Sequence, residues 1–202
     1  AAFRIGCRML STRSYWEECK ATTVKTPGVA SETWSQLGAA EWFPINDVIM
    51  GGQSTSSLSC DGHGRLVFAG CINTKGGGFA AIRTCEGCKV AVPANATVAK
   101  IVAEGDGQQY KLTLGLDHSL LSGLPVWSHD FHTEKGAVKE CSLPLGSFMA
   151  GKRGRAVPDA TLDLSKVQYL GLALSLVDQH GQPNPHFGDG PFKLILHSIS
   201  FE

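Results

Sequence analysis

The sequence predicts an all-β fold, and three observations lead to that class. Short apolar runs of strand length alternate with Gly, Pro, Asn and Asp turns from residue 42 onward, a pattern typical of a sandwich or barrel. Long stretches with helical periodicity are missing. Glycine is frequent, at 24 of 202 residues. About ten expected strands with almost no helix indicate a two-sheet antiparallel β-sandwich of jelly-roll type.

The N-terminal segment differs from the rest in composition. Residues 1–26 carry five basic residues against two acidic ones. The first fourteen residues combine Arg, Ser and apolar side chains without an acid, which is typical of a mitochondrial or plastid transit peptide; an ordinary basic tail is the alternative. A short amphipathic helix is expected over 15–26. We therefore expect a basic tail and linker over 1–41, either a targeting remnant or a partner-binding extension, and a β-sandwich domain over 42–202.

The first half of the domain is expected to contain strands joined by tight turns. Asp61-Gly-His-Gly64 separates two strand-like runs and is a hairpin signal. Tyr110, Leu112, Leu114 and Leu116 share one face of their strand, which predicts a core face. The expected strands after the run that starts at Trp42 are 54–60, 65–70, 79–84, 98–104 and 110–116.

The second half follows the same pattern. Residues 126–133 and 137–143 flank Glu134-Lys-Gly136 and are expected to form a second hairpin. The run 167–177 is apolar or small on both faces, as in the middle of a covered sheet. The remaining expected elements are one helical turn over 144–149, a basic loop over 151–158, a polar loop over 178–190 and a final strand over 191–201.

The least ordinary stretch is Asn46-Asp-Val-Ile-Met-Gly-Gly-Gln-Ser54. Asn and Asp favour hydrogen bonds from side chain to backbone, and the paired glycines permit positive φ or close backbone approach. A nucleophile with a base, or a phosphate cradle, is not visible in it. We interpret it as a shaped loop that braces the sandwich or meets a partner. Its candidate residues are Asn46, Asp47, Met50, Gly51, Gly52 and Ser54.

Arg83 lies in an otherwise small and apolar run. A buried arginine requires a carboxylate or several acceptors, and Asp47, Glu104 and Asp106 are the carboxylates nearest the turns. We expect Arg83 to link its strand to the loop at Asp47, with an exposed strand arginine as the alternative. Further candidates for a structural or protein-binding role are Asp106, Arg153 and Arg155.

Several function classes have little support. A net charge of zero gives no reason to expect a nucleic-acid partner, and the longest apolar run is too short to span a bilayer. Seven cysteines cannot form a complete disulfide framework, so a reducing compartment is the simpler expectation. Cys85-Glu-Gly-Cys88 lacks a βαβ setting or a second ligand pair, and we interpret its thiols as structural or incidental. We expect no catalytic activity, cofactor or metal.

Six motifs in order give a specific resemblance. The sequence resembles the complex I intermediate-associated protein 30 family, from Trp42 to the C-terminus. One departure is Val48, where the family usually has a small residue. The motifs are INDVIMGGQS (45–54), FAGCINTKGGGFAAIRT (68–84), EGDGQQYKLTL (104–114), FHTEKGAVKECSLPLGSF (131–148), YLGLALS (169–175) and GPFKLILHSI (190–199).

The resemblance implies a galactose-binding-like jelly-roll sandwich and a non-enzymatic role. The implied partners are subunits or assembly intermediates of respiratory complex I (NADH:ubiquinone oxidoreductase), at the matrix face of the mitochondrial inner membrane. Relatives also serve plastids. A transient assembly factor and a retained accessory subunit both remain open. A carbohydrate-binding module is the alternative, although Trp42, Trp127, Tyr110 and Tyr169 lie in strand-like runs where core packing competes with a sugar platform.

Overall fold

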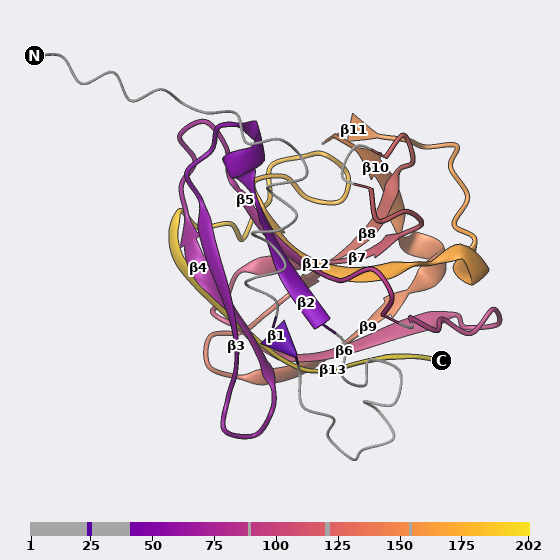
Figure 1. The fold of residues 1–202 in the computed structure, drawn as a ribbon, viewed down its shortest axis with the longest axis horizontal. Coiled ribbons are helices and arrows are strands. Elements are labelled where there is room, and N and C mark those ends of the chain that lie inside the picture. Colours follow the sequence, from indigo (N-terminus) through magenta and orange to yellow (C-terminus); the bar gives the residue numbers. More distant parts are fainter. Residues whose placement is uncertain (1–23, 26–40, 89, 120–121, 154) are drawn as a thin grey trace, which may run out of the picture.

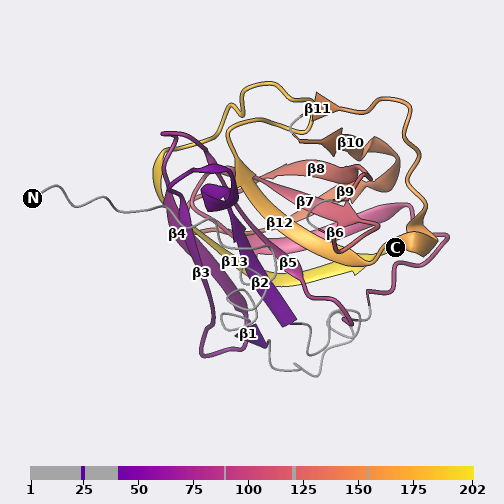
Figure 2. The ribbon, with the colours of Figure 1, turned by 45° about the horizontal axis from the view of Figure 1, so that its top comes forward.

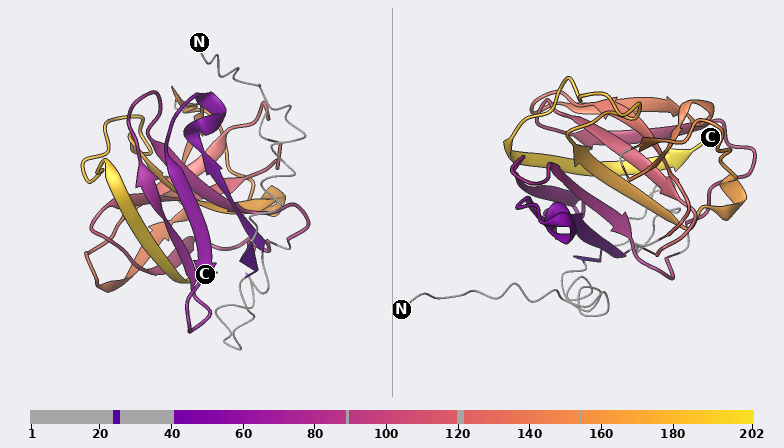
Figure 3. Two further views of the ribbon diagram at one scale, coloured as in Figure 1. Left: turned by 60° about the vertical axis from the view of Figure 1, so that its left-hand side comes forward. Right: turned by 90° about the horizontal axis from the view of Figure 1, so that it is seen from above.

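The computed structural model describes residues 24–25, 41–88, 90–119, 122–153 and 155–202. In this part of the chain two antiparallel sheets form a β-sandwich (Figure 1). Figure 2 shows β12 in orange and β13 in yellow, which lie inside different sheets, and Figure 3 gives two further views. The predicted all-β jelly-roll class is confirmed.

The larger sheet has eight strands and the smaller has five. The larger runs in the order β1 (Val24–Lys25), β2 (Glu41–Asn46), β5 (Phe79–Thr84), β12 (Tyr169–Ser175), β7 (Gln109–Gly115), β8 (Val126–His132), β10 (Met149–Lys152) and β11 (Arg155–Ala156). The smaller runs in the order β3 (Thr55–Cys60), β4 (Leu66–Ile72), β13 (Gly190–Phe201), β6 (Val98–Glu104) and β9 (Val138–Pro144). The described residues also form the 3-10 helices η2 (Asp47–Met50), η3 (Leu145–Ser147) and η4 (Leu164–Lys166).

Alternating side chains of both sheets fill the core between the layers. Tyr110, Leu112 and Leu114 of β7 are fully buried, as their shared face predicts. Phe68 of β4 meets Phe192 of β13 edge to face, with ring centroids 4.9 Å apart. Burying an aliphatic or aromatic side chain of this size contributes roughly 1.5–3 kcal/mol. The hydrophobic core is therefore the main source of stability.

The predicted first hairpin is confirmed, and the second is wrong. Strands β3 and β4 pair directly, with Cys60 opposite Leu66. Strand β8 pairs with β7 and β10 in the larger sheet, whereas β9 pairs with β6 in the smaller one. The Glu134-Lys-Gly136 turn therefore carries the chain from one layer to the other. A turn of this composition can join two strands of one sheet or two strands of different sheets. The local sequence therefore does not reveal which sheet the next strand joins.

The β12 strand confirms another prediction, while the basic loop needs correction. Strand β12 lies between β5 and β7 in the larger sheet, as expected for a run that is apolar or small on both faces.

The sequence predicts a loop over residues 151–158, yet these residues contain most of the short β10–β11 hairpin. That hairpin depends on pairing with β8, through Met149 opposite Ser128. The local sequence does not show that pairing.

Most of the predicted tail over residues 1–41 lies outside the described residues. Within it, Val24 and Lys25 form strand β1, opposite Trp42 and Glu41. The helix expected over 15–26 therefore does not extend to these two residues. At the other edge of the larger sheet, β11 also has two residues. Pro44, in the middle of β2, is paired with Ile82 of β5.

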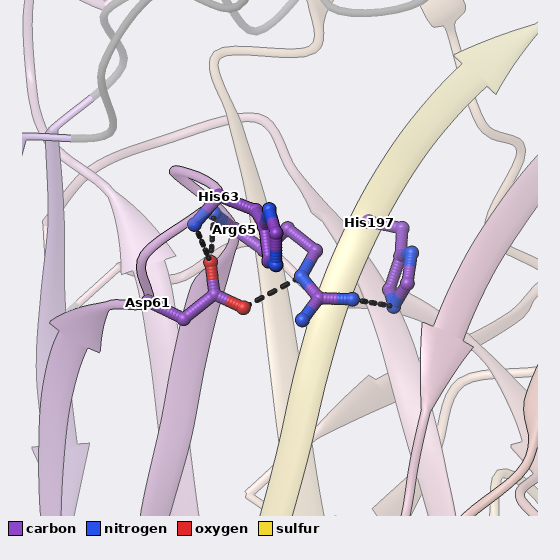
Figure 4. A network of polar contacts seen from close by, with 4 residues as sticks. All are labelled: Asp61, His63, Arg65 and His197. Atoms are coloured by element: carbon purple, nitrogen blue, oxygen red, sulfur yellow. Dashed lines mark hydrogen bonds and ion pairs between the residues drawn. The ribbon is translucent and has the colours of Figure 1, made fainter.

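The turn between β3 and β4 is fastened by a carboxylate (Figure 4). Asp61 accepts hydrogen bonds from the backbone N–H of His63 and of Arg65, both at 2.9 Å, and from Arg65 Nε at 2.6 Å. Arg65 Nη1 in turn donates to His197 Nε2 on β13 at 3.2 Å. Burial and the Arg65 charge lower the pKa of His197, which suits a ring that accepts. The network ties the hairpin turn to the neighbouring strand.

Asp61 is expected to titrate well below an ordinary aspartate. Desolvation acts to raise its pKa, but the two backbone N–H groups and the Arg65 side chain outweigh it and lower the pKa from 3.8 to about 2. Since the folded pKa is depressed, the contribution of Asp61 to stability is complete above pH 3.8 and is lost as the pH falls toward 2. An NMR titration of the Asp61 carboxyl carbon measures this midpoint. Arg65→Met should raise it, and a wild-type midpoint near 3.8 would contradict the network.

Candidate functional site

The loop after β2 is organised around the carboxylate of Asp47, which is fully buried. Asp47 Oδ1 accepts from Ser54 N at 2.9 Å. Asp47 Oδ2 accepts from Ser54 Oγ at 2.7 Å, Gly78 N at 2.7 Å and Phe79 N at 3.3 Å. A carboxylate with several N–H donors is stabilised in its charged form. Asp47 therefore holds together η2, the start of β3 and the start of β5.

Two glycines allow the backbone to close around this carboxylate. A Cβ on Gly52 would lie 2.2 Å from Asp47 Cγ, and one on Gly77 would lie 2.2 Å from Asp47 Oδ2. Gly51 ends η2 at φ +88°, a conformation that favours glycine. Burial acts to raise the pKa of Asp47, but the hydrogen bonds from Ser54, Gly78 and Phe79 together lower it. The GGG motif at 76–78 thus works with the loop as a structural unit.

The same loop presents apolar side chains to solvent. Val48 is 58% exposed and Met50 is 66% exposed. Leu176, 45% exposed, belongs to the same end of the sandwich, because its N–H donates to Gly78 O while Gly78 N donates to Asp47. We call Val48, Met50 and Leu176 the apolar end. Asn46, also predicted as a candidate, accepts from Ser56 Oγ at 2.7 Å and links β2 to β3.

A cavity of about 280 Å³ opens on the outer face of the larger sheet. Its floor comes from β5, β7 and β12, and its walls come from residues 116–119, 122–126 and 151–153. Its polar lining residues are Arg83, Thr113, Asp117, Ser119, Ser122, Lys152, Arg153 and Tyr169.

Arg83 is buried at 4% exposure, and the expected link to Asp47 is wrong. The guanidinium carbon lies 5.1 Å from the centroid of the Phe43 ring and 4.8 Å from that of the Tyr169 ring. Arg83 Nη2 donates to the His118 carbonyl oxygen at 2.5 Å. Asp47 binds the start of β5 at Phe79, and four residues of strand separate that point from Arg83 by about 13 Å.

The surroundings of Arg83 were not found from the sequence. Phe43 and Tyr169 lie in strand-like runs far apart in the sequence, and only the registers of β2 and β12 with β5 bring them to Arg83. Burial and then the Arg83 charge lower the pKa of His118. Its Nε2 donates to the Gln168 carbonyl oxygen at 3.1 Å. His118 Nε2 is therefore bonded to the backbone and does not act as a base toward Ser122 in the cavity lining.

The three remaining predicted candidates lie apart from the loop at Asp47. Asp106 accepts from Tyr110 OH at 3.0 Å and from Lys193 N at 2.8 Å, so it fastens the β6–β7 turn to β13. Arg153 lines the cavity and has φ +51° in the β10–β11 turn. Arg155 is exposed on β11. The structure brings together Arg83 and Arg153, but not Asp106 or Arg155.

The larger sheet also carries two oppositely charged residues that the sequence did not single out. Lys111 of β7 lies opposite Asp130 of β8. Burial lowers the pKa of Lys111 and raises the pKa of Asp130, and the nearby opposite charge partly offsets each shift. Asp130 Oδ2 accepts from Gln179 N at 2.8 Å, and Asp130 N donates to Gln179 Oε1 at 2.6 Å. Asp130 therefore holds Gln179, at the start of the 178–190 loop, against the sheet.

Within the described ranges, no group of three or more His, Cys, Asp or Glu side chains is placed to hold a metal ion. Trp42, Trp127 and Tyr110 pack in the hydrophobic core, as expected. Tyr169 is also buried, but its ring lies against the Arg83 guanidinium. Of the helices in the described part of the chain, none has both the length and the apolar character to cross a bilayer.

The sequence was also compared with protein families and with curated proteins. The family model of complex I intermediate-associated protein 30 matches residues 32–196. Comparison with curated protein sequences gives no match.

Two solved structures from Clostridium thermocellum have a similar fold. One is a Family 11 carbohydrate-binding module in complex with a beta-1,3-1,4-mixed-linked tetrasaccharide, with TM-score 0.57, 11% identity, and coverage of 89% of this chain and 94% of that chain. The other is the Family 11 module of the cellulosomal cellulase Lic26A-Cel5E, with TM-score 0.56, 11% identity, and coverage of 87% and 95%. At this identity the likeness concerns the fold alone.

Proposed function

Because the chain belongs to the complex I intermediate-associated protein 30 family, we propose that it is a non-catalytic, protein-binding scaffold of mitochondrial respiratory complex I. The family membership expected from the six motifs is confirmed. We place the protein at the matrix side of the inner membrane, attached peripherally through protein contacts. Its partners are subunits or assembly intermediates of that complex.

One observation supports a binding role most directly. The apolar end presents Val48 and Met50 to solvent on η2, while Asp47 in the same helix is fully buried and anchored by hydrogen bonds. Apolar side chains held on a rigid support lose little conformational entropy when a partner covers them. Methionine adapts its shape to irregular surfaces. The exposure of these two side chains supports a docking role for the loop that marks the family in the sequence.

The proposal is tested by replacing the exposed residues of the apolar end. Val48→Asp combined with Met50→Asp should reduce co-migration of the chain with complex I species at least tenfold on native gels of mitochondrial membranes. The reason is that two buried carboxylates without partners are costly in an interface. Thermal unfolding of the purified variant should match the wild type, since both positions are exposed.

Val138→Asp is the matched control, because Val138 is 55% exposed on β9 of the smaller sheet, away from the apolar end. It should leave co-migration unchanged. Wild-type chain running with an intermediate alone identifies a transient assembly factor, and running with the mature complex identifies a retained accessory subunit. Wild-type chain found as a free monomer alone would refute the proposal, as would a double variant that still co-migrates.

A carbohydrate-binding role is the second candidate, supported by the likeness to Family 11 modules and by the cavity on the larger sheet. Sugar sites use exposed aromatic rings as platforms. Tyr169 lines the cavity, but it is 6% exposed and its ring lies against the Arg83 guanidinium. Micromolar binding of an oligosaccharide in calorimetry would favour this role over the scaffold.

A further inference from the structure

The turn between β5 and β6 brings two thiols together. Cys85 Sγ and Cys88 Sγ lie 3.4 Å apart. Cys88 N donates to Cys85 O at 3.2 Å, which closes a four-residue turn. Gly87 has φ +90°, the conformation that a type II turn requires at its third residue. The backbone therefore holds the two cysteines at a spacing that a disulfide can bridge.

The position of this turn also suits exchange with a reagent in solution. Both thiols are partly exposed, and Glu86 and Gly87 at the tip of the turn are exposed. Cys88 packs against the hydrophobic core, so it is held in place while the tip faces solvent. Burial raises the pKa of the Cys60 and Cys141 thiols, which makes their reactive thiolate forms scarcer.

We propose that Cys85 and Cys88 form a reversible thiol–disulfide exchange site that takes small disulfides such as glutathione disulfide. The thiolate of one cysteine attacks the small disulfide, forms a mixed disulfide and expels one thiolate. The second cysteine then attacks the protein sulfur of that mixed disulfide and expels the second thiolate. Two protein thiols are thereby oxidised to one disulfide, and the small disulfide is reduced to two thiols, with both protons passing to the leaving thiolates.

The geometry gives this pair an advantage over a single thiol. A second thiol held 3.4 Å from the first makes the resolving step intramolecular, and a well-oriented intramolecular step proceeds at a high effective concentration. Cys71, exposed on β4, serves as the internal reference for simple mixed-disulfide formation.

The test is a titration of the full chain with glutathione disulfide at fixed reduced glutathione. Samples are quenched in acid, alkylated with N-ethylmaleimide and digested with trypsin, which releases residues 84–89 as one peptide carrying both cysteines. We expect this peptide to become about 2 Da lighter, for the two hydrogens lost, and to resist alkylation. Half-oxidation should occur at a glutathione disulfide concentration at least tenfold below the one that half-modifies Cys71.

Two variants separate this site from incidental thiols. Cys88→Ser should leave Cys85 with a glutathione adduct in place of the internal disulfide. Gly87→Ala keeps both thiols but strains the turn at positive φ, so its half-oxidation should require several-fold more glutathione disulfide. The proposal fails if the wild-type peptide carries only glutathione adducts, or if it oxidises no more readily than Cys71 is modified. It also fails if Gly87→Ala oxidises at the wild-type concentration.

Discussion

Asp47→Ala is expected to lower the free energy of unfolding by about 4 kcal/mol. The substitution removes an acceptor shared by Ser54 N, Ser54 Oγ, Gly78 N and Phe79 N. Donors left buried without a partner each cost about 1–3 kcal/mol. The effect should extend to three segments at once, because the same carboxylate holds η2, β3 and β5.

Urea denaturation of both proteins measures this loss. Asp159→Ala, at an exposed position, is the control and should change stability by less than about 0.5 kcal/mol. Asp47→Asn should fall between the two, since it keeps one carbonyl oxygen. Because folding lowers the pKa of Asp47, the difference between wild type and Asp47→Asn should be complete above pH 3.8 and shrink as the pH falls below it. An Asp47→Ala protein of wild-type stability would mean that this carboxylate does not hold the loop.

Arg83→Met is expected to lower the free energy of unfolding by about 2–3 kcal/mol. Methionine preserves most of the apolar volume between the Phe43 and Tyr169 rings, so the loss comes from the charge. A desolvated cation over an aromatic ring contributes about 2 kcal/mol, and the His118 carbonyl oxygen also loses its charged donor.

An independent readout separates this role from general packing. Since the Arg83 charge helps to lower the pKa of His118, Arg83→Met should raise that pKa, and an NMR titration of the imidazole measures the change. Arg155→Met, at an exposed position on β11, should alter neither quantity. An unchanged His118 titration together with wild-type stability would show that the guanidinium is not coupled to this segment.

Much of the fold could be predicted from the sequence, because strand formation and turn formation are largely local. The strands expected from residue 54 onward are all present, with ends within two residues of those observed. Which strands become neighbours is a long-range property. The sequence therefore predicted a hairpin around Glu134-Lys-Gly136, where the chain in fact crosses between the sheets. For the same reason it predicted a loop where the β10–β11 hairpin lies.

The site was predictable to the extent that it depends on neighbouring residues in the chain. Asn-Asp followed by two glycines indicated a shaped loop, and the structure gives it that form through Asp47. The partners of Arg83 come from β2, β12 and the His118 segment, far apart in sequence. A charged residue in an apolar run signals that acceptors must exist, but not where they are. Only the strand register identifies them.

The edges of the eight-stranded sheet have a consequence for how the protein meets other chains. Both outermost strands have two residues, and the next strand inward at one edge carries Pro44, which has no N–H to give to an added strand. Short edges and proline are devices by which β-proteins avoid edge-to-edge aggregation. They also work against β-augmentation, in which a partner adds its own strand to the sheet. At these two edges of the larger sheet, contact with another chain therefore depends on side chains and not on an added strand.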